Sequence, residues 1–459
     1  MIPLSLRRIA VIVGGRLSDV QDPGTLVTAP TAVDSRDVRR GGLFAALVGD
    51  RADGHDYAAR AIEAGAVAVL ASRPVGVPAV VVADVAEALA SLATHVLQRF
   101  EKPVVIGVTG SSGKTSTKDL LASVMPVLGL TTVNERSMNN ELGLPLTVLR
   151  AVEDTRYLVL EMGARRIGDI AWLTRIAAPR VGVVTNVGSA HIGVFGSREA
   201  IASAKGELVE ALPRDGLAVL NADDPLAAEM ATRTSARIMT FGEGATADVR
   251  AQDVALDEHA RASFVLAFRG ATAPVSLPLH GRHHISNALA AASVALGLGA
   301  ELAPVAAALS QAAPGSPGRM QVRDRSDGLR IVDDTFNANP DSVHAALQAL
   351  ASMAGGRRMV AVLGEMRELG DHAVPGHQKV GRAVADNGVD VLVAIGTEHA
   401  DVVVRETLRH APRTRILRGK NGEEALALLQ EELGPGDIAL FKAAHVAGFG
   451  EVVGRVLSG

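Results

Sequence analysis

The segment Gly107-Val-Thr-Gly-Ser-Ser-Gly-Lys-Thr-Ser116 has the layout of a loop that binds phosphate groups. The apolar run Val104-Val-Ile106 before it predicts a buried parallel strand, and residues 118–124 after it predict the first turns of a helix. Glycines let backbone N–H groups approach phosphate oxygens, and the positive end of the helix adds to this attraction. We therefore expect Lys114 to reach the terminal phosphates of a nucleotide, and the hydroxyl of Thr115 to bind Mg²⁺.

The loop departs from the strict pattern G-x-x-x-x-G-K-[ST], since Val108 stands five residues before Gly113. A tighter form, T-G-x-x-G-K-T, remains. The alternative is a glycine-rich turn that binds nothing, and the position of both Lys and Thr after a strand argues against it. The residues expected to line the phosphates are Thr109, Gly110, Ser111, Ser112, Gly113, Lys114, Thr115 and Ser116.

Composition excludes several classes of protein. A chain of 459 residues favours two to four domains, and 48 % apolar residues with a net charge of −4 imply ordinary cores and no polyanionic partner. Aromatic residues are only 3 % of the chain, which disfavours a surface that stacks nucleic-acid bases. The absence of cysteine rules out disulfides, thiolate metal sites and cysteine nucleophiles. Without an 18-residue apolar span or a signal-peptide pattern, we expect a cytoplasmic protein with no membrane partner.

Lysine is unusually rare in this chain. Only seven of the 46 basic residues are lysines, and the others are arginines. An amine can lose its proton and react, whereas a guanidinium cannot, so a lysine retained here is a candidate for chemistry. This argument selects Lys114, Lys205 and Lys442, with an ordinary solvated side chain as the alternative for the last two.

The pattern along the chain predicts an α/β fold with three domains. They are a small N-terminal α/β domain (1–101), a central phosphate-loop ATPase-type domain with a parallel sheet (102–313) and a C-terminal Rossmann-like domain (314–459). The hinge at Glu101-Lys-Pro103 and the linker Ala312–Gly318, rich in proline and glycine, separate them. Three such domains with hinges are typical of a ligase or kinase that closes around its substrates.

Periodicity predicts the main elements within these domains. Strands are expected at 42–48, 67–70, 80–82, 104–106, 157–161, 181–186, 330–334, 359–363, 391–395 and 438–441, and helices at 57–65, 85–100 and 118–124. In doubly wound sheets, ligands bind at the carboxyl ends of the strands, where Glu161 and Asn186 fall.

A second group of candidates follows the phosphate loop. Glu161 ends a strand, His191 lies just past another strand, and Lys205 lies fourteen residues later in a predicted helix. A carboxylate and a neutral imidazole are plausible Mg²⁺ ligands, although oxygen ligands are commoner. A lysine would suit such a site only if CO₂ converted its amine to an anionic carbamate. The alternatives are a capping histidine for His191 and a surface acid for Glu161, the latter disfavoured after four apolar residues.

At this point the chain resembles the Mur ligases of peptidoglycan synthesis, in order and over nearly its whole length. The matching segments are 109–115 (TGSSGKT), 139–145 (NNELGLP), 161–163 (EMG), 190–191 (AH) with 195–197 (FGS), 204–207 (AKGE), 281–287 (GRHHISN), 317–319 (PGR) and 333–341 (DDTFNANPD).

Within that family, the chain is most similar to members that join D-alanyl-D-alanine to UDP-N-acetylmuramoyl-tripeptide. The segments that indicate this are 34–36 (DSR), 49–57 (GDRADGHDY), 109–115, 337–340 (NANP) and 364–370 (GEMRELG). The resemblance implies an ATP-dependent ligase that acts as a monomer, with these two molecules as substrates and an acyl phosphate as intermediate.

The resemblance also implies roles for individual residues. The implied catalytic residues are Lys114, Lys205, His191 and Glu161. Thr115 and Glu161 would bind one Mg²⁺, and His191 and carbamylated Lys205 a second. Asn287 would meet the adenine of ATP, with Arg319, Asp334 and Asn337 nearer its ribose and phosphates. The implied residues for the muramoyl substrate and the incoming amine are Ser35, Arg36, Asp53, His55, Asn139, Asn140 and Lys442.

The chain departs from the family at three places. Phe336 stands where tyrosine is common, and residues 192–194 lack the acidic residue often found after the histidine. Lys442 is kept, but Ala443-Ala-His445 follows in place of the usual Gly-Ser-Arg. Because that region places the incoming amine, a related ligase with a different amine or carboxylate stays open as an alternative.

Three further alternatives were weighed. A folylpolyglutamate synthase would lack the N-terminal domain with its Asp-Ser-Arg and Asp-Gly-His-Asp segments. A non-catalytic nucleotide-sugar-binding protein would not need the intact set of Lys114, Thr115, Glu161, His191 and Lys205. A phosphate-loop kinase or GTPase is disfavoured because the chain has no N-K-x-D motif for guanine.

Overall fold

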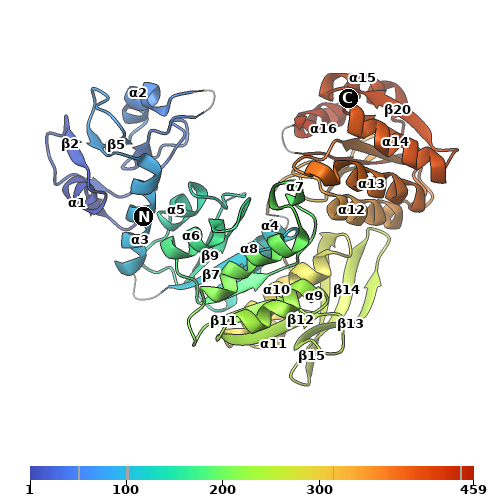
Figure 1. The fold of residues 1–459 in the computed structure, drawn as a ribbon, viewed down its shortest axis with the longest axis horizontal. Coiled ribbons are helices and arrows are strands. Elements are labelled where there is room, and N and C mark those ends of the chain that lie inside the picture. The colour runs from blue at the N-terminus through green and yellow to red at the C-terminus, as the bar shows by residue number, and fades with distance from the viewer. Residues whose placement is uncertain (50–51, 100–102, 136, 314, 445–446, 459) are drawn as a thin grey trace.

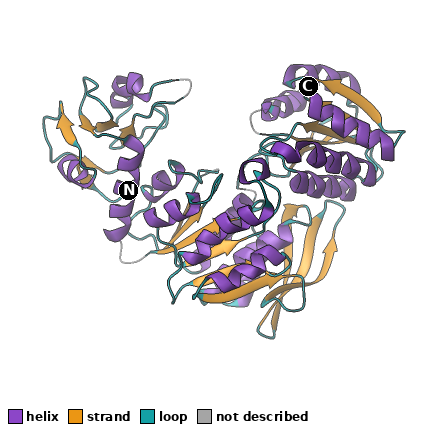
Figure 2. Ribbon diagram, viewed as in Figure 1, coloured by secondary structure: helices purple, strands orange, loops and turns teal. Residues whose placement is uncertain are grey.

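The computed structural model describes residues 1–49, 52–99, 103–135, 137–313, 315–444 and 447–458. Within these ranges the chain forms three α/β regions, each around its own sheet (Figures 1 and 2). The sheets have four, nine and six strands from the N-terminus onward, and a two-stranded ribbon accompanies the first. The α/β class with a central parallel sheet is confirmed.

The N-terminal sheet has the order β2-β6-β5-β4. Its strands are β2 (Arg16–Ser18), β4 (Leu43–Ala45), β5 (Ala68–Ala71) and β6 (Ala79–Val81), and the ribbon pairs β1 (Leu4–Ser5) with β3 (Leu26–Val27). Its helices are α1 (Leu6–Ile12), α2 (Ala58–Glu63) and α3 (Val85–Arg99). The predicted helix at 57–65 begins as a 3₁₀ turn (Gly54–Tyr57) and ends before Gly65, whose φ is +110°.

The central sheet has the order β15-β14-β13-β12-β11-β10-β7-β9-β8. Its parallel part consists of β7 (Val104–Thr109), β8 (Thr131–Val133), β9 (Tyr157–Glu161), β10 (Val181–Val184), β11 (Leu217–Asn221) and β12 (Arg237–Gly242). β13 (Val249–Leu256) continues this part and then pairs antiparallel with β14 (Arg261–Phe268), which pairs antiparallel with β15 (Ala271–His280). Of the central strands, β7, β9 and β10 were predicted from the sequence, whereas β8, β11, β12 and the last three strands were not.

Helix α4 (Lys114–Val124) begins directly at the phosphate loop, four residues before the predicted helix. Gly113 caps it in the left-handed conformation, with a φ of +79°. The first helical N–H groups therefore face the loop, as phosphate binding requires. The other helices of this region are α5 (Gly143–Val148), α6 (Asp169–Ile176), α7 (Ile192–Phe195), α8 (Arg198–Glu210), α9 (Pro225–Ala228), α10 (His284–Gly297) and α11 (Leu302–Ser310).

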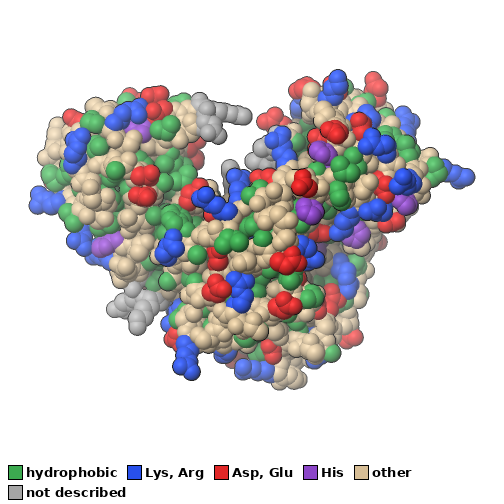
Figure 3. Space-filling model, in the orientation of Figure 1, with side chains coloured by type: hydrophobic (Ala, Val, Ile, Leu, Met, Phe, Trp, Pro, Cys, Tyr) green, Lys and Arg blue, Asp and Glu red, His purple; other side chains and the backbone are tan. Residues whose placement is uncertain are grey.

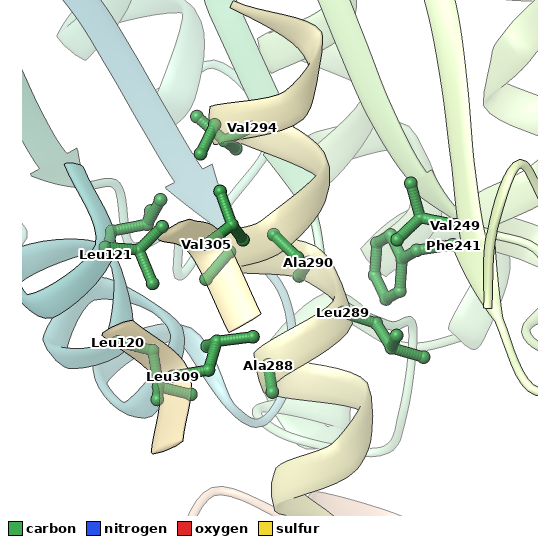
Figure 4. Packing of buried hydrophobic residues seen from close by; sticks show 14 of the residues in the cluster. Leu120, Leu121, Phe241, Val249, Ala288, Leu289, Ala290, Val294, Val305 and Leu309 are labelled. Carbon is green, nitrogen blue, oxygen red and sulfur yellow. The ribbon is translucent and has the colours of Figure 1, made fainter. Parts of the chain in front are cut away.

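Helix α10 forms the centre of the central core (Figure 4). It is buried nearly all round, which explains its run of apolar and small residues. Leu289 packs toward Phe241 and Val249 of the sheet, while α4 and α11 cover the other side. This packing fixes the start of α10, which carries Asn287, against the phosphate loop.

The C-terminal sheet has the order β16-β17-β21-β18-β19-β20 and is parallel apart from the edge strand β16. Its strands are β16 (Gln321–Asp324), β17 (Arg330–Asp333), β18 (Met359–Gly364), β19 (Val391–Ile395), β20 (Arg415–Gly419) and β21 (Ile438–Lys442). Helices α12 (Pro340–Met353), α13 (Ala373–Asp386) and α14 (Glu398–His410) cover one face, and α15 (Gly422–Glu432) and α16 (Phe449–Ser458) the other. The four strands predicted here are confirmed.

A hollow lies between the N-terminal and C-terminal regions on the face of the molecule that Figure 3 shows. One apolar cluster joins the N-terminal region to α5 and α6, and another joins the C-terminal region to α7 and α8. The predicted domain boundaries at 101/102 and 313/314 fall on residues 101, 102 and 314, outside the described ranges, and stay predictions. No described helix has both the length and the apolar character needed to span a membrane.

Candidate active site

A cavity of about 1660 Å³ lies at the carboxyl edge of the central sheet and is lined by residues of the central and C-terminal regions. It brings together most of the predicted site residues, which come from three strand ends, three helices and the C-terminal region. Those that line it are Ser111, Ser112, Gly113, Lys114, Thr115, Ser116, Asn139, Asn140, Glu161, His191, Lys205, Asn287, Arg319, Asp334, Asn337 and Lys442. Thr109 and Gly110 lie behind this lining, where β7 ends and the loop begins.

The phosphate loop is held in shape by its neighbours. The Lys114 amine donates a hydrogen bond to the Gly110 carbonyl at 2.7 Å, across the loop. A Cβ on Gly113 would lie 2.3 Å from Oδ1 of Asn287, so the close approach of α10 requires glycine there. Burial lowers the pKa of Lys114, with the charge of Arg319 adding to the shift and that of Glu161 opposing it.

Asn186 follows β10 and holds the phosphate loop through its side-chain amide. It was predicted to lie at a strand end, without a role. Its Oδ1 accepts the N–H of Ser112 at 2.9 Å, and its Nδ2 donates to the Ser112 carbonyl at 3.1 Å. The Thr185 hydroxyl donates to the same carbonyl at 2.7 Å. In the sequence, the only sign of this loop-holding role is that two polar residues, Thr185 and Asn186, follow an apolar strand.

Glu161 is 1 % exposed and lies beside the hydroxyl of Thr115. Thr115 donates to its Oε2 at 2.9 Å, and Asn139 donates to its Oε1 at 2.7 Å. Arg319 in turn donates to the Thr115 hydroxyl at 3.0 Å. A carboxylate and a hydroxyl at this distance form an oxygen-rich corner beside the phosphate loop, which suits Mg²⁺.

His191 and Lys205 face the same cavity from α7 and α8. The Nδ1 of His191 pairs with the carboxylate of Glu368, so Nδ1 carries the proton and Nε2 keeps its lone pair. Burial lowers the pKa of His191, and Glu368 partly offsets the shift. The imidazole is therefore neutral near pH 7 and able to act as a metal ligand.

Lys205 is 4 % exposed, and within the described part of the chain its amine has no hydrogen-bond or ionic partner. Burial, aided by the charge of Lys114, holds the pKa of Lys205 well below its usual range. Its amine is therefore a candidate for the neutral state in which it can react. Among the described residues, no three acidic or histidine side chains cluster as metal ligands, so a metal here would also need oxygens from a substrate.

Lys442 is buried within the C-terminal region. It donates to Oδ2 of Asp334 at 2.5 Å and to the carbonyl of Asn337 at 2.9 Å, which holds the 334–337 segment against the cavity. Arg319 stacks on the ring of Phe336, 4.0 Å from its centre. This contact uses the aromatic face, which the change from tyrosine keeps.

Two histidines precede Asn287 at the start of α10, of which His284 is buried and His283 is partly buried. Burial lowers the pKa of His283 to about 4 and the pKa of His284 well below its usual range. Their rings lie 4.3 Å apart, and both line the cavity. They provide a neutral aromatic wall beside Asn287.

The N-terminal candidates lie away from this cavity. Arg36 is exposed and pairs with Asp34 at 2.5 Å, while Ser35 is buried. His55 accepts the N–H of Ser72 on Nε2 at 3.0 Å and donates from Nδ1 to Asp53 at 2.5 Å. Both ring nitrogens of His55 are thus used inside the region. The structure does not bring these residues together with the phosphate loop.

The altered segment after Lys442 is described only in part. Ala443 and Ala444 are buried, and Ala443 packs beside Gly364. His445, on which the departure from the family partly rests, lies outside the described residues.

A phosphate loop that faces a carboxylate and a buried lysine, in a cavity shared by two α/β regions, defines a nucleotide-dependent enzyme. The chain belongs to the Mur ligase family. Residues 31–97 match the family's catalytic domain, residues 108–295 its middle domain and residues 318–445 its glutamate ligase domain.

Relatives with this family's fold cover the chain from end to end. A UDP-N-acetylmuramoyl-tripeptide–D-alanyl-D-alanine ligase of Mycobacterium bovis is 47 % identical, over 100 % of this chain and 98 % of its own. The crystal structure I of MurF from Acinetobacter baumannii aligns with a TM-score of 0.87 at 31 % identity, over 100 % and 99 % of the two chains. The structure of MurF ligase from Thermotoga maritima in complex with ADP aligns with a TM-score of 0.79 at 31 % identity, over 94 % of this chain and 98 % of its own.

Proposed function

We propose that this enzyme joins D-alanyl-D-alanine to UDP-N-acetylmuramoyl-tripeptide, with ATP as the energy source, in peptidoglycan synthesis. The observation that carries this conclusion is the full-length identity of 47 % to a ligase of that name. The complete set of phosphate-loop and strand-end residues in one cavity agrees with it. No observation favours a ligase with a different amine or carboxylate.

The reaction has two steps that balance in atoms and charge. A substrate carboxylate oxygen attacks the γ-phosphorus of ATP, which forms an acyl phosphate and releases ADP. The neutral amine of D-alanyl-D-alanine then attacks the acyl carbon, the amide forms, and phosphate leaves as the amine loses its proton. Positioning and charge neutralisation dominate such phosphoryl transfers, and we assign this work to Lys114 and the loop N–H groups.

Two metal sites fit the residues present. Thr115 and Glu161 supply a hydroxyl and a carboxylate for one Mg²⁺, and His191 supplies a free Nε2 for a second, together with Lys205. Bound Mg²⁺ would neutralise charge on the transferred phosphoryl group.

Lys205 would serve the second site as a carbamate. Its neutral amine attacks CO₂, an N–C bond forms as one C=O π bond opens, and the proton leaves to water. The product is an anion with two oxygen ligands. The low pKa of Lys205 and its unpaired amine within the described structure support this step, and arginine could not perform it.

The remaining predicted residues form two groups. For ATP, we assign Asn287 to the adenine and Arg319, Asp334 and Asn337 to the ribose and phosphates. For the muramoyl substrate, we assign Asn139 and Asn140 at the cavity, and Ser35, Arg36, Asp53 and His55 to its UDP end. Lys442 acts by holding the 334–337 segment beside the incoming amine. We infer a cytoplasmic monomer with the three domains 1–101, 102–313 and 314–459.

The test is Mg²⁺-dependent release of phosphate from ATP in the presence of UDP-N-acetylmuramoyl-tripeptide, with and without D-alanyl-D-alanine. Release should require both substrates, and mass spectrometry should find a product heavier by the dipeptide. Lys114→Ala should abolish release, whereas Lys420→Ala, at an exposed position, should not. Release with another amine but none with D-alanyl-D-alanine would overturn the assignment of the acceptor.

A further inference from the structure

The segment Gly364-Glu-Met-Arg-Glu-Leu-Gly370 has no role in the reaction as described so far. It follows β18 of the C-terminal sheet and reaches the central region, where it meets the loop between β10 and α7. That loop carries His191. Figure 1 shows α7 directly against the C-terminal region.

Glu368 makes the contacts at the tip of this segment. Its carboxylate pairs with Nδ1 of His191, and its backbone carbonyl accepts the N–H of Gly193 at 2.9 Å. The guanidinium of Arg165, in the loop after β9, lies 3.6 Å from the same carboxylate. One residue of the C-terminal region therefore touches two of the loops that shape the cavity.

The backbones of Gly193 and Gly370 approach each other as closely as glycines permit. A Cβ on Gly193 would lie 2.2 Å from the nitrogen of Gly370, and a Cβ on Gly370 would lie 2.8 Å from Cα of Gly193. Glu368 and Gly370 both adopt positive φ, +59° and +51°. This contact forms only when both backbones follow these paths, so it fixes the relative position of the two segments. An exposed ion pair alone would not do so.

The base of the segment is fixed inside the C-terminal region. Oε1 of Glu365 accepts three backbone N–H groups at the start of α14, from Thr397, His399 and Ala400, at 2.7 to 3.2 Å. The N–H of Met366 donates to Nε2 of His377 at 3.1 Å. Glu368 therefore projects from a rigid support.

Asp341 provides a second point of contact with the same loop. Its Oδ2 accepts both the N–H and the hydroxyl of Ser189, at 3.1 and 2.9 Å, and its Oδ1 accepts from Lys379 at 2.7 Å. The loop from Ser189 to Gly193 is therefore held by the C-terminal region on both sides of His191.

We propose that Gly364–Gly370 is an interdomain clasp, in which Glu368 is a positioning residue that orients the ring of His191 and holds the C-terminal region against the central one. The clasp couples the placement of the C-terminal region to the geometry of the reaction centre. The orienting role rests on the proposed function, whereas the holding role does not.

The experiment compares Glu368→Ala and Gly193→Ala with two controls, Glu431→Ala at an exposed position and Gly454→Ala, where a Cβ meets nothing within 4 Å. Loss of a residue that orients a metal-binding histidine costs about 10- to 100-fold, so kcat of Glu368→Ala should fall by at least about tenfold. KM for D-alanyl-D-alanine should change by less than about twofold, because the lost contact does not bind that substrate. Glu368→Gln, which can still accept from Nδ1, should recover part of kcat.

Small-angle scattering without ligands measures the holding role by itself. The radius of gyration should rise in Gly193→Ala and stay unchanged in both controls, with thermal unfolding as the check on folding. If the wild-type enzyme failed to ligate but this rise appeared, the proposed function would fail and the clasp would stand. Unchanged scattering in both clasp variants would overturn the holding role.

A double-mutant cycle measures the orienting role. If Glu368 acts through His191, adding Glu368→Ala to His191→Ala should lower kcat by less than about twofold further. The orienting role would be overturned if the kcat losses of the two single variants multiplied in the double variant. Full activity of Glu368→Ala would also overturn it.

Discussion

Lys205 shows how a single buried residue can indicate chemistry. A charged amine at 4 % exposure beside the amine of Lys114 would be strongly unfavourable, and burial costs a charged group most when no partner compensates it. A neutral amine, or an anion formed from it, resolves the conflict. Rarity of lysine in the sequence pointed to the same residue for an independent reason.

Replacement of Lys205 tests the carbamate. Lys205→Arg should lower kcat by at least about tenfold, since a guanidinium cannot form a carbamate. Lys205→Ala should be equally impaired and should regain part of its activity when a short-chain carboxylic acid is added, which supplies the missing anion. An unimpaired Lys205→Arg enzyme would exclude the role.

His283 predicts a dependence of stability on pH. Its pKa is about 4 in the folded chain and about 6.5 in the unfolded one, so the unfolded chain binds more protons between these values. Its contribution is complete above pH 6.5 and is lost as pH falls to 4, by roughly 3 kcal/mol. The free energy of unfolding, measured in urea, should fall more steeply between pH 6.5 and pH 4 for the wild type than for His283→Gln. Parallel pH profiles would contradict the assignment.

At the scale of residues, the sequence predicted candidate site residues that the structure brings to one cavity, but it missed the residues that hold them in place. Lys114, Glu161 and His191 lie at or just after a glycine loop or a strand, and such positions can be recognised locally. Lys205 lies within α8 and was selected because lysine is rare in the chain. Glu368 lies 177 residues from its partner His191, and no local pattern joins them. Long-range partners become visible only once the fold brings them together.

At the scale of elements, Glu207 links two helices that flank the site. From α8 it accepts the N–H groups of Gly168 and Ala171 at the start of α6, at 2.6 and 2.9 Å. Its negative charge also suits the positive end of α6. Glu207 belongs to a segment shared with the family, and these contacts give it a structural role two residues from Lys205.

Glu207→Ala should therefore destabilise the fold. Two N–H groups would lose a buried, charged acceptor, and each such bond contributes about 1.5–3 kcal/mol. We expect a decrease of about 3 kcal/mol in the free energy of unfolding, measured by chemical denaturation. Glu210→Ala, three residues along the same helix and exposed, is the matched control and should change little.

The same scale explains which strands were predictable. Buried parallel strands such as β9 and β19 are continuous apolar runs, and their predicted bounds are confirmed. The three strands from β13 to β15 were missed because one face is solvated and apolar residues alternate with polar ones. In β15, the side chains of Ala273, Val275, Leu277 and Leu279 are buried, which is the period of two typical of a half-buried strand.

At the scale of the whole molecule, a hollow separates the N-terminal region from the C-terminal region (Figure 3), and the proposed substrate residues are divided between regions. The UDP-end candidates, Arg36 and Asp53, lie in the N-terminal region, whereas the phosphate loop lies in the central region, in the cavity it shares with the C-terminal region. An acyl phosphate must be kept from water, which requires the regions to enclose it. The open hollow implies movement of the N-terminal region during the reaction.

Scattering should detect this movement. Addition of a non-hydrolysable ATP analogue together with UDP-N-acetylmuramoyl-tripeptide should lower the radius of gyration, because the proposed sites of the two ligands lie in different regions that must approach each other. The analogue alone should have a smaller effect, since the phosphate loop and the C-terminal region already adjoin. An unchanged radius with both ligands would show that the regions do not close.

The paired glycines of the clasp have a genetic consequence. When one side of a tight contact gains a methyl group, a second mutation usually restores it by shortening the opposing side chain. Here neither Gly193 nor Gly370 has a side chain to shorten. Second-site suppressors of Gly193→Ala should therefore arise as changes in loop length or at residues that set the loop's path, and not at position 370.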